Sequence, residues 1–268
     1  MAKASMKRKP AVTERPLLEG GFEAVALAEV LEATALGRQP ITVEVRDDRQ
    51  GVLGSIRLKG GMVVGAETPA ARGKEAFASL MGDRRARSYV ARQVPVAAGE
   101  AARPVGPLQE LLSAPSPDAH RAAIKESWSR VAPILDTAVD LFYKRLFELR
   151  PDLRALFPAD MTEQKKKLGA TLGFVVGSLD WPARDWAHEQ DPKTDLFLAV
   201  LSLGQRHRTS YAVKDEHYGP VGEALLWTLE QGLGDAFQGL TREAWTHAYR
   251  LLSTTMKLSG GLVQGGRS

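Results

Sequence analysis

Residues 123–158 read AIKESWSRVAPILDTAVDLFYKRLFELRPDLRALFP. On both sides of Pro133, apolar residues recur three and four positions apart, which is the spacing of one helix face. Pro151 stands where the first turn of a helix tolerates proline, ahead of a short helix that ends near Phe157. This stretch therefore predicts consecutive helices and no strands.

The same periodicity continues toward the C-terminus. Gly232 and Gly234 follow one apolar stripe and are expected to close its helix. Residues 118–263 thus predict an all-α bundle of roughly six or seven helices. The later stripes are Leu168, Leu172, Val175 and Val176; Leu198, Leu201 and Leu203; Val221, Leu225, Leu226 and Leu229; and Trp245, Tyr249 and Leu252.

Residues 17–92 mix two periodicities, which predicts a small α+β domain in front of the bundle. This range holds no histidine and no pair of acids at a catalytic spacing, so no catalytic constellation is evident in it. The expected elements are a helix at 27–35, a strand at 41–45, a hairpin around the Gly-Gly pair at 60–61, a helix at 73–81 and a strand at 88–94.

Two further segments are read from composition. Residues 93–117 are rich in proline and alanine and predict a linker, with one short helical turn at Leu108–Leu112. Residues 1–16 carry five basic side chains and one acidic one, and we expect a solvated, disordered tail. The formal net charge of the chain is +4, so the remainder sums to zero, which argues against a nucleic-acid-binding body.

Composition also limits the chemistry. The chain has no cysteine, which excludes disulfides, iron–sulfur clusters, thiolate ligands and a cysteine nucleophile, and is compatible with a cytoplasmic protein. The most apolar windows, such as residues 196–204, are too short to span a bilayer, and no apolar run follows the basic tail as a secretory signal would require.

The five histidines form no HExxH motif and no close metal-binding pair. His207 lies four residues after Leu203, on the face of an apolar helical stripe. By itself, such a histidine is more often a surface or hydrogen-bonded core residue than a metal ligand.

Longer stretches change this interpretation. The segments at 123–158, EQKKKLGATLGFVVGSL, LGQRH, EHYGPVGEALLWTLEQGLG and AWTHAYRLL resemble, in order, the bacterial globins, and most closely the single-domain haemoglobins and the haem domain of flavohaemoglobins. The resemblance covers residues 120–258. It implies a globin fold at 118–263, haem b as cofactor, and a diatomic gas (O2, NO or CO) as ligand.

On the proximal side, the resemblance matches His207 to the histidine that binds the iron and Tyr218 to a nearby tyrosine. Two departures accompany the match. The chain has one residue more between these positions than the relatives, which implies a bulged corner. Flavohaemoglobins place a glutamate eleven residues after the tyrosine that Tyr249 matches, where this chain has Gly260. This departure weakens the support for NO-dioxygenating or peroxidase-like chemistry.

On the distal side, the resemblance matches Phe157 to the phenylalanine on the haem face, and Tyr143 and Gln164 to the hydrogen-bond donors that face the gas. Leu168 lies one turn beyond Gln164 and would shape access to the pocket. Without the resemblance, Tyr143 reads as a core tyrosine, Gln164 as an exposed residue at a helix start, and Phe157 and Leu168 as ordinary core residues.

The first half of the chain has a resemblance of its own. LAEVLEATALGRQPITVEV and GSIRLKGGMVVGAE resemble the PatA N-terminal domain family of bacterial signalling proteins. Together the two resemblances imply a cytoplasmic gas sensor that signals to a protein partner through residues 17–92, with a homo-oligomer also open. An NO dioxygenase served by an external reductase and a haem-free globin-like signalling module remain as alternatives.

Overall fold

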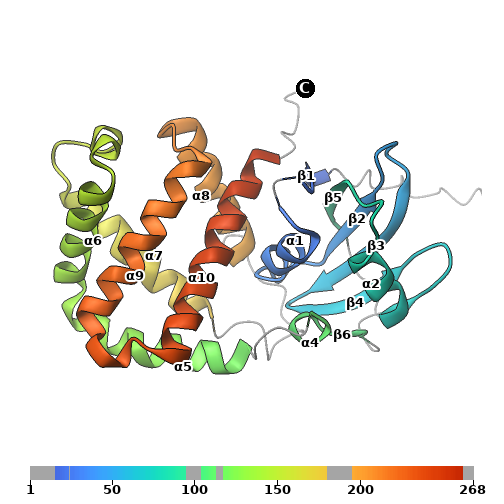
Figure 1. The fold of residues 1–268 in the computed structure, drawn as a ribbon, viewed down its shortest axis with the longest axis horizontal. Helices are drawn as coiled ribbons and strands as arrows, with labels where there is room; N and C mark the ends of the chain where they lie inside the picture. Colours follow the sequence, from blue (N-terminus) through green and yellow to red (C-terminus); the bar gives the residue numbers. More distant parts are fainter. Residues whose placement is uncertain (1–15, 24, 95–103, 113–116, 180–194, 262–268) are drawn as a thin grey trace, which may run out of the picture.

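The computed structural model describes residues 16–23, 25–94, 104–112, 117–179 and 195–261. A mixed sheet-and-helix part and a helical part lie side by side along the longest axis (Figure 1). This is the predicted fold class, an α+β region followed by an all-α region. The expected tail falls outside the described residues except for Pro16, which begins a strand.

The first part is built on a six-stranded antiparallel sheet of order β1-β5-β2-β3-β4-β6. Gly60 and Gly61 adopt φ of 53° and 78°, the left-handed conformation that the tight turn between β3 and β4 requires. The predicted hairpin is therefore confirmed. The strands are β1 Pro16–Gly21, β2 Ile41–Arg46, β3 Val52–Lys59, β4 Met62–Glu67, β5 Ser88–Gln93 and β6 Gly106–Pro107.

Alternation along the strands decides which face of the sheet is covered. Ile41, Val43 and Val45 of β2 are buried, while the residues between them are half-buried. Helix α1 (Leu27–Thr34) and helix α2 (Gly73–Met81) match the predicted helices. Strand β1 was not predicted, because Leu18 is its single buried residue and the segment has no clear alternation.

The structure describes part of the proline-rich segment, residues 104–112, and this part packs on the sheet. Gly106 pairs with Val63 across β6 and β4, and Leu108, at the start of the short helix α4 (Leu108–Leu111), is fully buried. The helical turn expected at Leu108–Leu112 is present. Apolar burial therefore holds the end of this segment on the sheet.

The helical part confirms the predicted bundle. Its helices are α5 Pro117–Val131, α6 Leu135–Leu149, α7 Thr162–Ser178, α8 Leu196–Ser210, α9 Tyr218–Leu233 and α10 Gly239–Leu258. Short 3-10 helices flank them at Ala132–Ile134, Pro151–Leu156, Asp215–His217, Gly234–Ala236 and Ser259–Gly261. The Trp245 indole of α10 donates to the Ser127 hydroxyl of α5 at 2.9 Å, which ties the first helix of the bundle to the last.

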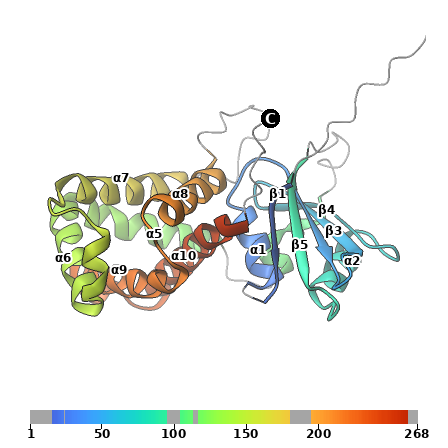
Figure 2. The same ribbon diagram turned by 90° about the horizontal axis from the view of Figure 1, so that it is seen from above.

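The two parts share an apolar core. Phe197, Leu201 and Leu258 of the helical part belong to the same buried cluster as the sheet and α1. Helices α1 and α10 lie against each other at the boundary in both ribbon views (Figures 1 and 2), and Arg250 of α10 bonds the buried Glu32 of α1 at 2.7 Å. The parts are therefore joined by packing and charge.

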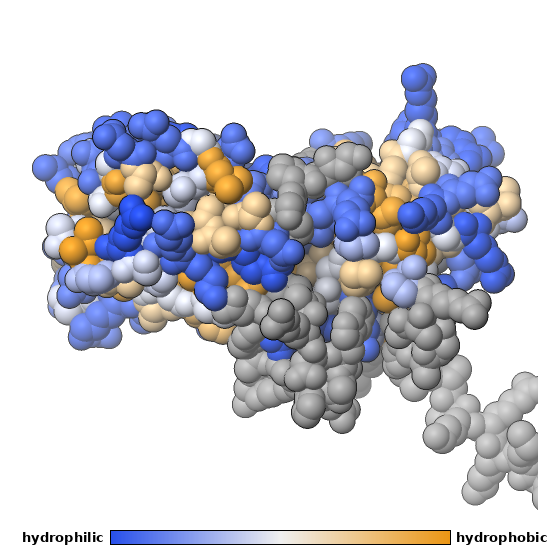
Figure 3. Space-filling view, turned by 90° about the horizontal axis from the view of Figure 1, so that it is seen from below, coloured by the Kyte–Doolittle hydropathy of each residue, from blue (hydrophilic) through white to orange (hydrophobic). Residues whose placement is uncertain are grey.

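The described surface has no single large apolar patch on the face drawn in Figure 3. On the face drawn in Figure 3, hydrophilic residues dominate the described part, and hydrophobic residues form separated groups. The exposed large apolar residues Val52, Ile134, Phe174, Tyr211 and Leu240 belong to different segments of the chain. Within the described ranges, no helix has the length and apolar character needed to cross a membrane.

Candidate functional site

The candidate distal residues lie together between α6 and α7. Tyr143 is 5% exposed. Burial raises the pKa of the Tyr143 phenol, and the neighbouring Gln164 side chain opposes this shift. The phenol therefore keeps its proton at neutral pH and can donate it to a ligand.

Aromatic packing fixes the position of this tyrosine. The Phe157 ring meets the Tyr143 ring edge-on, with 5.5 Å between the ring centroids. The centroid of the Phe147 ring lies 5.9 Å from that of Tyr143. Leu168 packs against the same cluster. The structure thus brings together four of the six candidate residues: Tyr143, Phe157, Gln164 and Leu168.

Helices α7 and α8 meet at one apolar contact, formed by Val175 of α7 with Leu196 and Val200 of α8. Leu168 precedes Val175 by seven residues, and His207 follows Val200 by seven, which is two helical turns in each case. Residues two turns apart share a face of a helix. His207 therefore lies on the face of α8 that is directed toward α7, the helix that carries Gln164 and Leu168.

The His207 imidazole is suited to bind a metal. Burial and the positive charge of Arg206 lower its pKa, so the ring is neutral at neutral pH, as a metal ligand must be. Its Nδ1 atom is buried and has no hydrogen-bond partner among the described residues. The Tyr211 ring meets the imidazole at 6.1 Å between centroids, inclined by 66°.

The corner after α8, where the resemblance implies an extra residue, has an irregular backbone. Helix α8 ends at Ser210, and Ala212 adopts φ of 51°, which is unusual for a residue other than glycine. The Val213 N–H then donates to the His207 carbonyl at 2.9 Å. This irregularity lies after the histidine, and the turn that carries His207 is α-helical.

Tyr218 and Gly260 lie on the far side of this corner. Tyr218 begins α9, is 8% exposed, and accepts a hydrogen bond at its carbonyl from the Tyr249 hydroxyl. Since His207 Nδ1 has no partner in the described part, the Tyr218 hydroxyl does not bond it here. An added Cβ at Gly260 would lie 3.1 Å from a guanidinium nitrogen of Arg208, so a cation stands beside this position.

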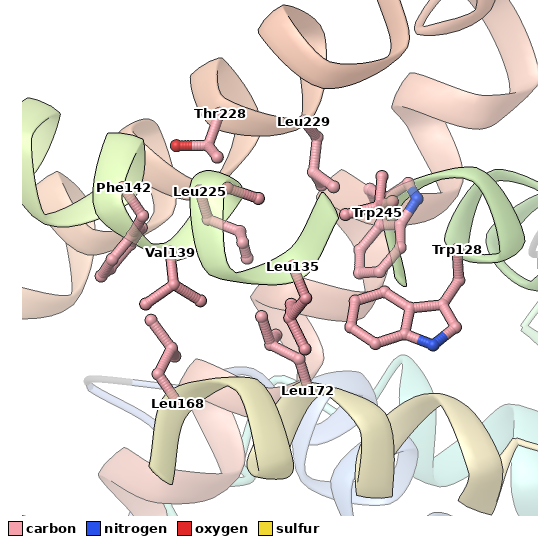
Figure 4. Close-up of a pocket in the computed structure, with 12 residues that line it drawn as sticks. Trp128, Leu135, Val139, Phe142, Leu168, Leu172, Leu225, Thr228, Leu229 and Trp245 are labelled. Carbon is pink, nitrogen blue, oxygen red and sulfur yellow. The ribbon is translucent and has the colours of Figure 1, made fainter. Parts of the chain in front are cut away.

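An apolar cavity lies directly behind the distal cluster. Leu168 and Leu172 point into it from α7, and Trp128 and Trp245 close its other end (Figure 4). The Thr228 hydroxyl at its wall is bonded to the Ala224 carbonyl, so it offers no free donor. The other lining residues are Val131, Leu135, Ala138, Val139, Phe142, Leu225 and Leu229.

Asp195, which directly precedes α8, was not among the residues predicted from the sequence. An aspartate directly before an apolar helical stripe is a capping signal, and Asp195 accepts the Leu198 N–H at 3.1 Å. Its other partners are far away in the sequence, and no local pattern indicates them. Phe147 was also missed as a neighbour of Tyr143, although both belong to one aromatic stripe.

The order of helices α5 to α10 and the apolar cavity among them define an all-α bundle with a candidate site beside α7. Comparison with known proteins matches residues 140–256 to the family described as Globin, so this part of the chain is a globin domain. The resemblance of residues 17–92 to the PatA N-terminal domain family stays a prediction.

The most similar proteins include flavohemoproteins and a neuroglobin. The Vibrio cholerae flavohemoprotein is 34% identical over 125 residues, 45% of this chain and 29% of that protein. The Chaenocephalus aceratus neuroglobin is 27% identical over 157 residues, 53% of this chain and 90% of that protein. A solved Malassezia yamatoensis flavohemoglobin aligns with a TM-score of 0.43 and 22% identity, over 53% of this chain and 36% of that one. The chain therefore spans less than a third of the Vibrio cholerae flavohemoprotein.

Proposed function

We propose that the globin domain holds haem b, with His207 as a protein ligand to iron, and binds O2 or another diatomic gas reversibly. The observation that carries this proposal is the buried Nδ1 atom of His207, unpartnered in the described part of the chain, on the face of α8 directed toward Gln164 and Leu168. Haem supplies an iron coordination position at which a diatomic gas binds.

The residues of the chain then perform three tasks. His207 would hold the group from one side, while Tyr143 and Gln164 would orient hydrogen-bond donors toward the gas ligand. Phe157 and Leu168 exclude water, which strengthens these bonds in the dry pocket. The apolar cavity behind Leu168 gives a gas molecule a place beside the site.

Tyr218 supports the proximal side without bonding His207, and its backbone is held by Tyr249. Sensing is the biological role that this arrangement supports best. Residues 17–92, which resemble the PatA N-terminal domain, would act as the signalling module for a protein partner, because they pack on the globin domain and lack a catalytic constellation.

A second candidate function is NO dioxygenation with a separate reductase. The similarity to flavohemoproteins favours this candidate. The position of Gly260 disfavours it, because a carboxylate there would increase electron donation by the histidine, whereas this chain has the Arg208 cation beside that position. Consumption of NO by the oxygenated protein, sustained by an added reductase, would decide for this candidate.

Hemin titration tests the proposal. Wild-type protein is expected to develop a Soret band at one hemin per chain, and His207→Ala is expected to lose the histidine-ligated ferrous spectrum and regain it with added imidazole. His247→Gln, on α10, is the control and should behave as the wild type. A colourless wild type would establish the haem-free alternative, and an unchanged spectrum in His207→Ala would remove His207 as the ligand.

A further inference from the structure

Helix α8 presents two different apolar faces to two different parts of the protein. Leu196 and Val200, on the face of His207, pack with Val175 of α7, and Leu36 of the N-terminal region lies at the edge of the same cluster. Phe197 and Leu201 are 0% and 2% exposed and belong to the core of the N-terminal sheet region. The helix that carries His207 is thus also part of the N-terminal domain's core.

Asp195 fixes the first turn of this helix to the same region. Its Oδ1 atom accepts the Leu198 N–H of α8, and its Oδ2 atom accepts the backbone N–H groups of Arg38 and Gln39 at 2.7 and 3.2 Å. Asp195 is 2% exposed, so these charge-assisted bonds are made away from water. One carboxylate therefore clamps α8 to residues 37–39.

Gly37 permits this close approach. A Cβ at this position would lie 3.1 Å from Asp195 Oδ1 and 3.1 Å from the Cβ of Phe197. Contacts this tight leave little room for a side chain. The turn after α1 therefore lies directly on the start of α8, and neither can shift without the other.

We propose that Asp195 is a positioning residue through which the N-terminal domain controls how far His207 can move when gas binds; this rests on the proposed function. The helix is continuous from Leu196 to Ser210. A displacement of His207 along the helix axis therefore reaches Asp195, about 18 Å away at 1.5 Å per residue. Occupancy of the gas site and the contact with residues 37–39 are then linked, and the linkage acts in both directions.

The second link between the two parts supplies a matched comparison. Arg250 of α10 bonds Glu32 and Glu29 of α1 at 2.7 and 3.4 Å. This link joins the same two domains but lies on a helix that does not carry His207. Loss of the Glu32 carboxylate loosens the interface in general, whereas loss of the Asp195 carboxylate loosens α8 in particular.

The test compares Asp195→Asn with Glu32→Gln in the full chain loaded with haem. The first readout is the iron–histidine stretching band of the ferrous protein by resonance Raman spectroscopy, together with the rate of CO association. We expect Asp195→Asn to shift that band and to change the CO rate by about threefold or more, and Glu32→Gln to leave both near wild type.

The second readout needs no variant. Hydrogen exchange of the Arg38 and Gln39 amides is measured in wild-type protein with and without CO, and it is expected to change on CO binding. This measurement decides the matter if Asp195→Asn does not fold.

Three results would overturn the proposal while a Soret band still supports the haem site. The first is an unchanged iron–histidine band and CO association rate in Asp195→Asn. The second is an equal effect of Asp195→Asn and Glu32→Gln on both measurements. The third is an amide exchange rate at residues 38 and 39 that is the same with and without CO. Absence of the Soret band in wild type would instead remove the proposed function and the coupling with it.

Discussion

The side chains of Tyr143 on α6 and Gln164 on α7 are neighbours, close enough for Gln164 to oppose the rise that burial causes in the pKa of the Tyr143 phenol. This pairing holds two donors beside the aromatic cluster before any ligand arrives. If O2 binds there, each donor can turn to the ligand with little reorganisation.

The first prediction concerns Tyr143→Phe. Removing the phenol O–H should raise the O2 dissociation rate roughly ten- to hundredfold, because a hydrogen bond to a charged acceptor in a dry site is lost. CO, which develops less negative charge, should be affected less. Stopped-flow O2 displacement measures the change. Tyr89→Phe, a buried tyrosine of the sheet, is the control and should leave the rate unaltered.

A second prediction tests the close crossing of α8 and α10 at Gly204. A Cβ at Gly204 would lie 2.7 Å from the Cα of Met256, which is closer than packing allows. Gly204→Ala should therefore destabilise the protein by about 1–3 kcal/mol in urea unfolding.

Gly177, near the end of α7, gives the matched comparison, since no atom lies within 4 Å of an added Cβ. Gly177→Ala should stabilise by about 0.5–1 kcal/mol through helix propensity. Equal effects of the two substitutions would contradict the crossing geometry.

Third, the bond from the Trp245 indole to Ser127 should matter for the bundle. Ser127→Ala leaves the buried indole N–H without its partner and should cost about 1–3 kcal/mol of unfolding free energy. Ser129→Ala, on the exposed face of the same helix, should cost much less. Tryptophan fluorescence during urea unfolding checks both, and a neutral Ser127→Ala would refute the role of this bond.

The fourth prediction is a pH dependence at the domain boundary. Burial lowers the pKa of His247, Glu32 opposes this shift, and the positive Arg250 and neighbouring His120 add to it. The unfolded chain therefore takes up this proton more readily than the folded one. The contribution of His247 is complete above about pH 6.5 and is lost as the pH falls below that value.

Acidification should accordingly lower the urea midpoint of wild-type protein more than that of His247→Gln. Urea titrations at about pH 7.5 and about pH 5.5 measure the two slopes. Parallel slopes would show that His247 does not contribute.

Local pattern was sufficient for most elements. Apolar stripes at helical spacing predicted the bundle, and alternating apolar residues around the Gly60-Gly61 turn predicted the hairpin. Both patterns involve residues that are close together in the sequence, so both can be recognised without the tertiary structure. The candidate residues Tyr143, Phe157, Gln164 and Leu168 came from a resemblance spread over many segments. The structure then placed them in one cluster. Strand β1 was missed because its partner β5 lies far along the chain.

The amino-acid sequence alone determined the helical and mixed halves, the absence of thiol chemistry and the apolar face that carries His207. Tertiary structure alone decided that the halves share a core, and that the carboxylate of Asp195 reaches the amides of Arg38 and Gln39. Periodicity records which face of a helix is apolar. It does not record which distant surface covers that face, because burial depends on the three-dimensional neighbour and not on the neighbour in sequence.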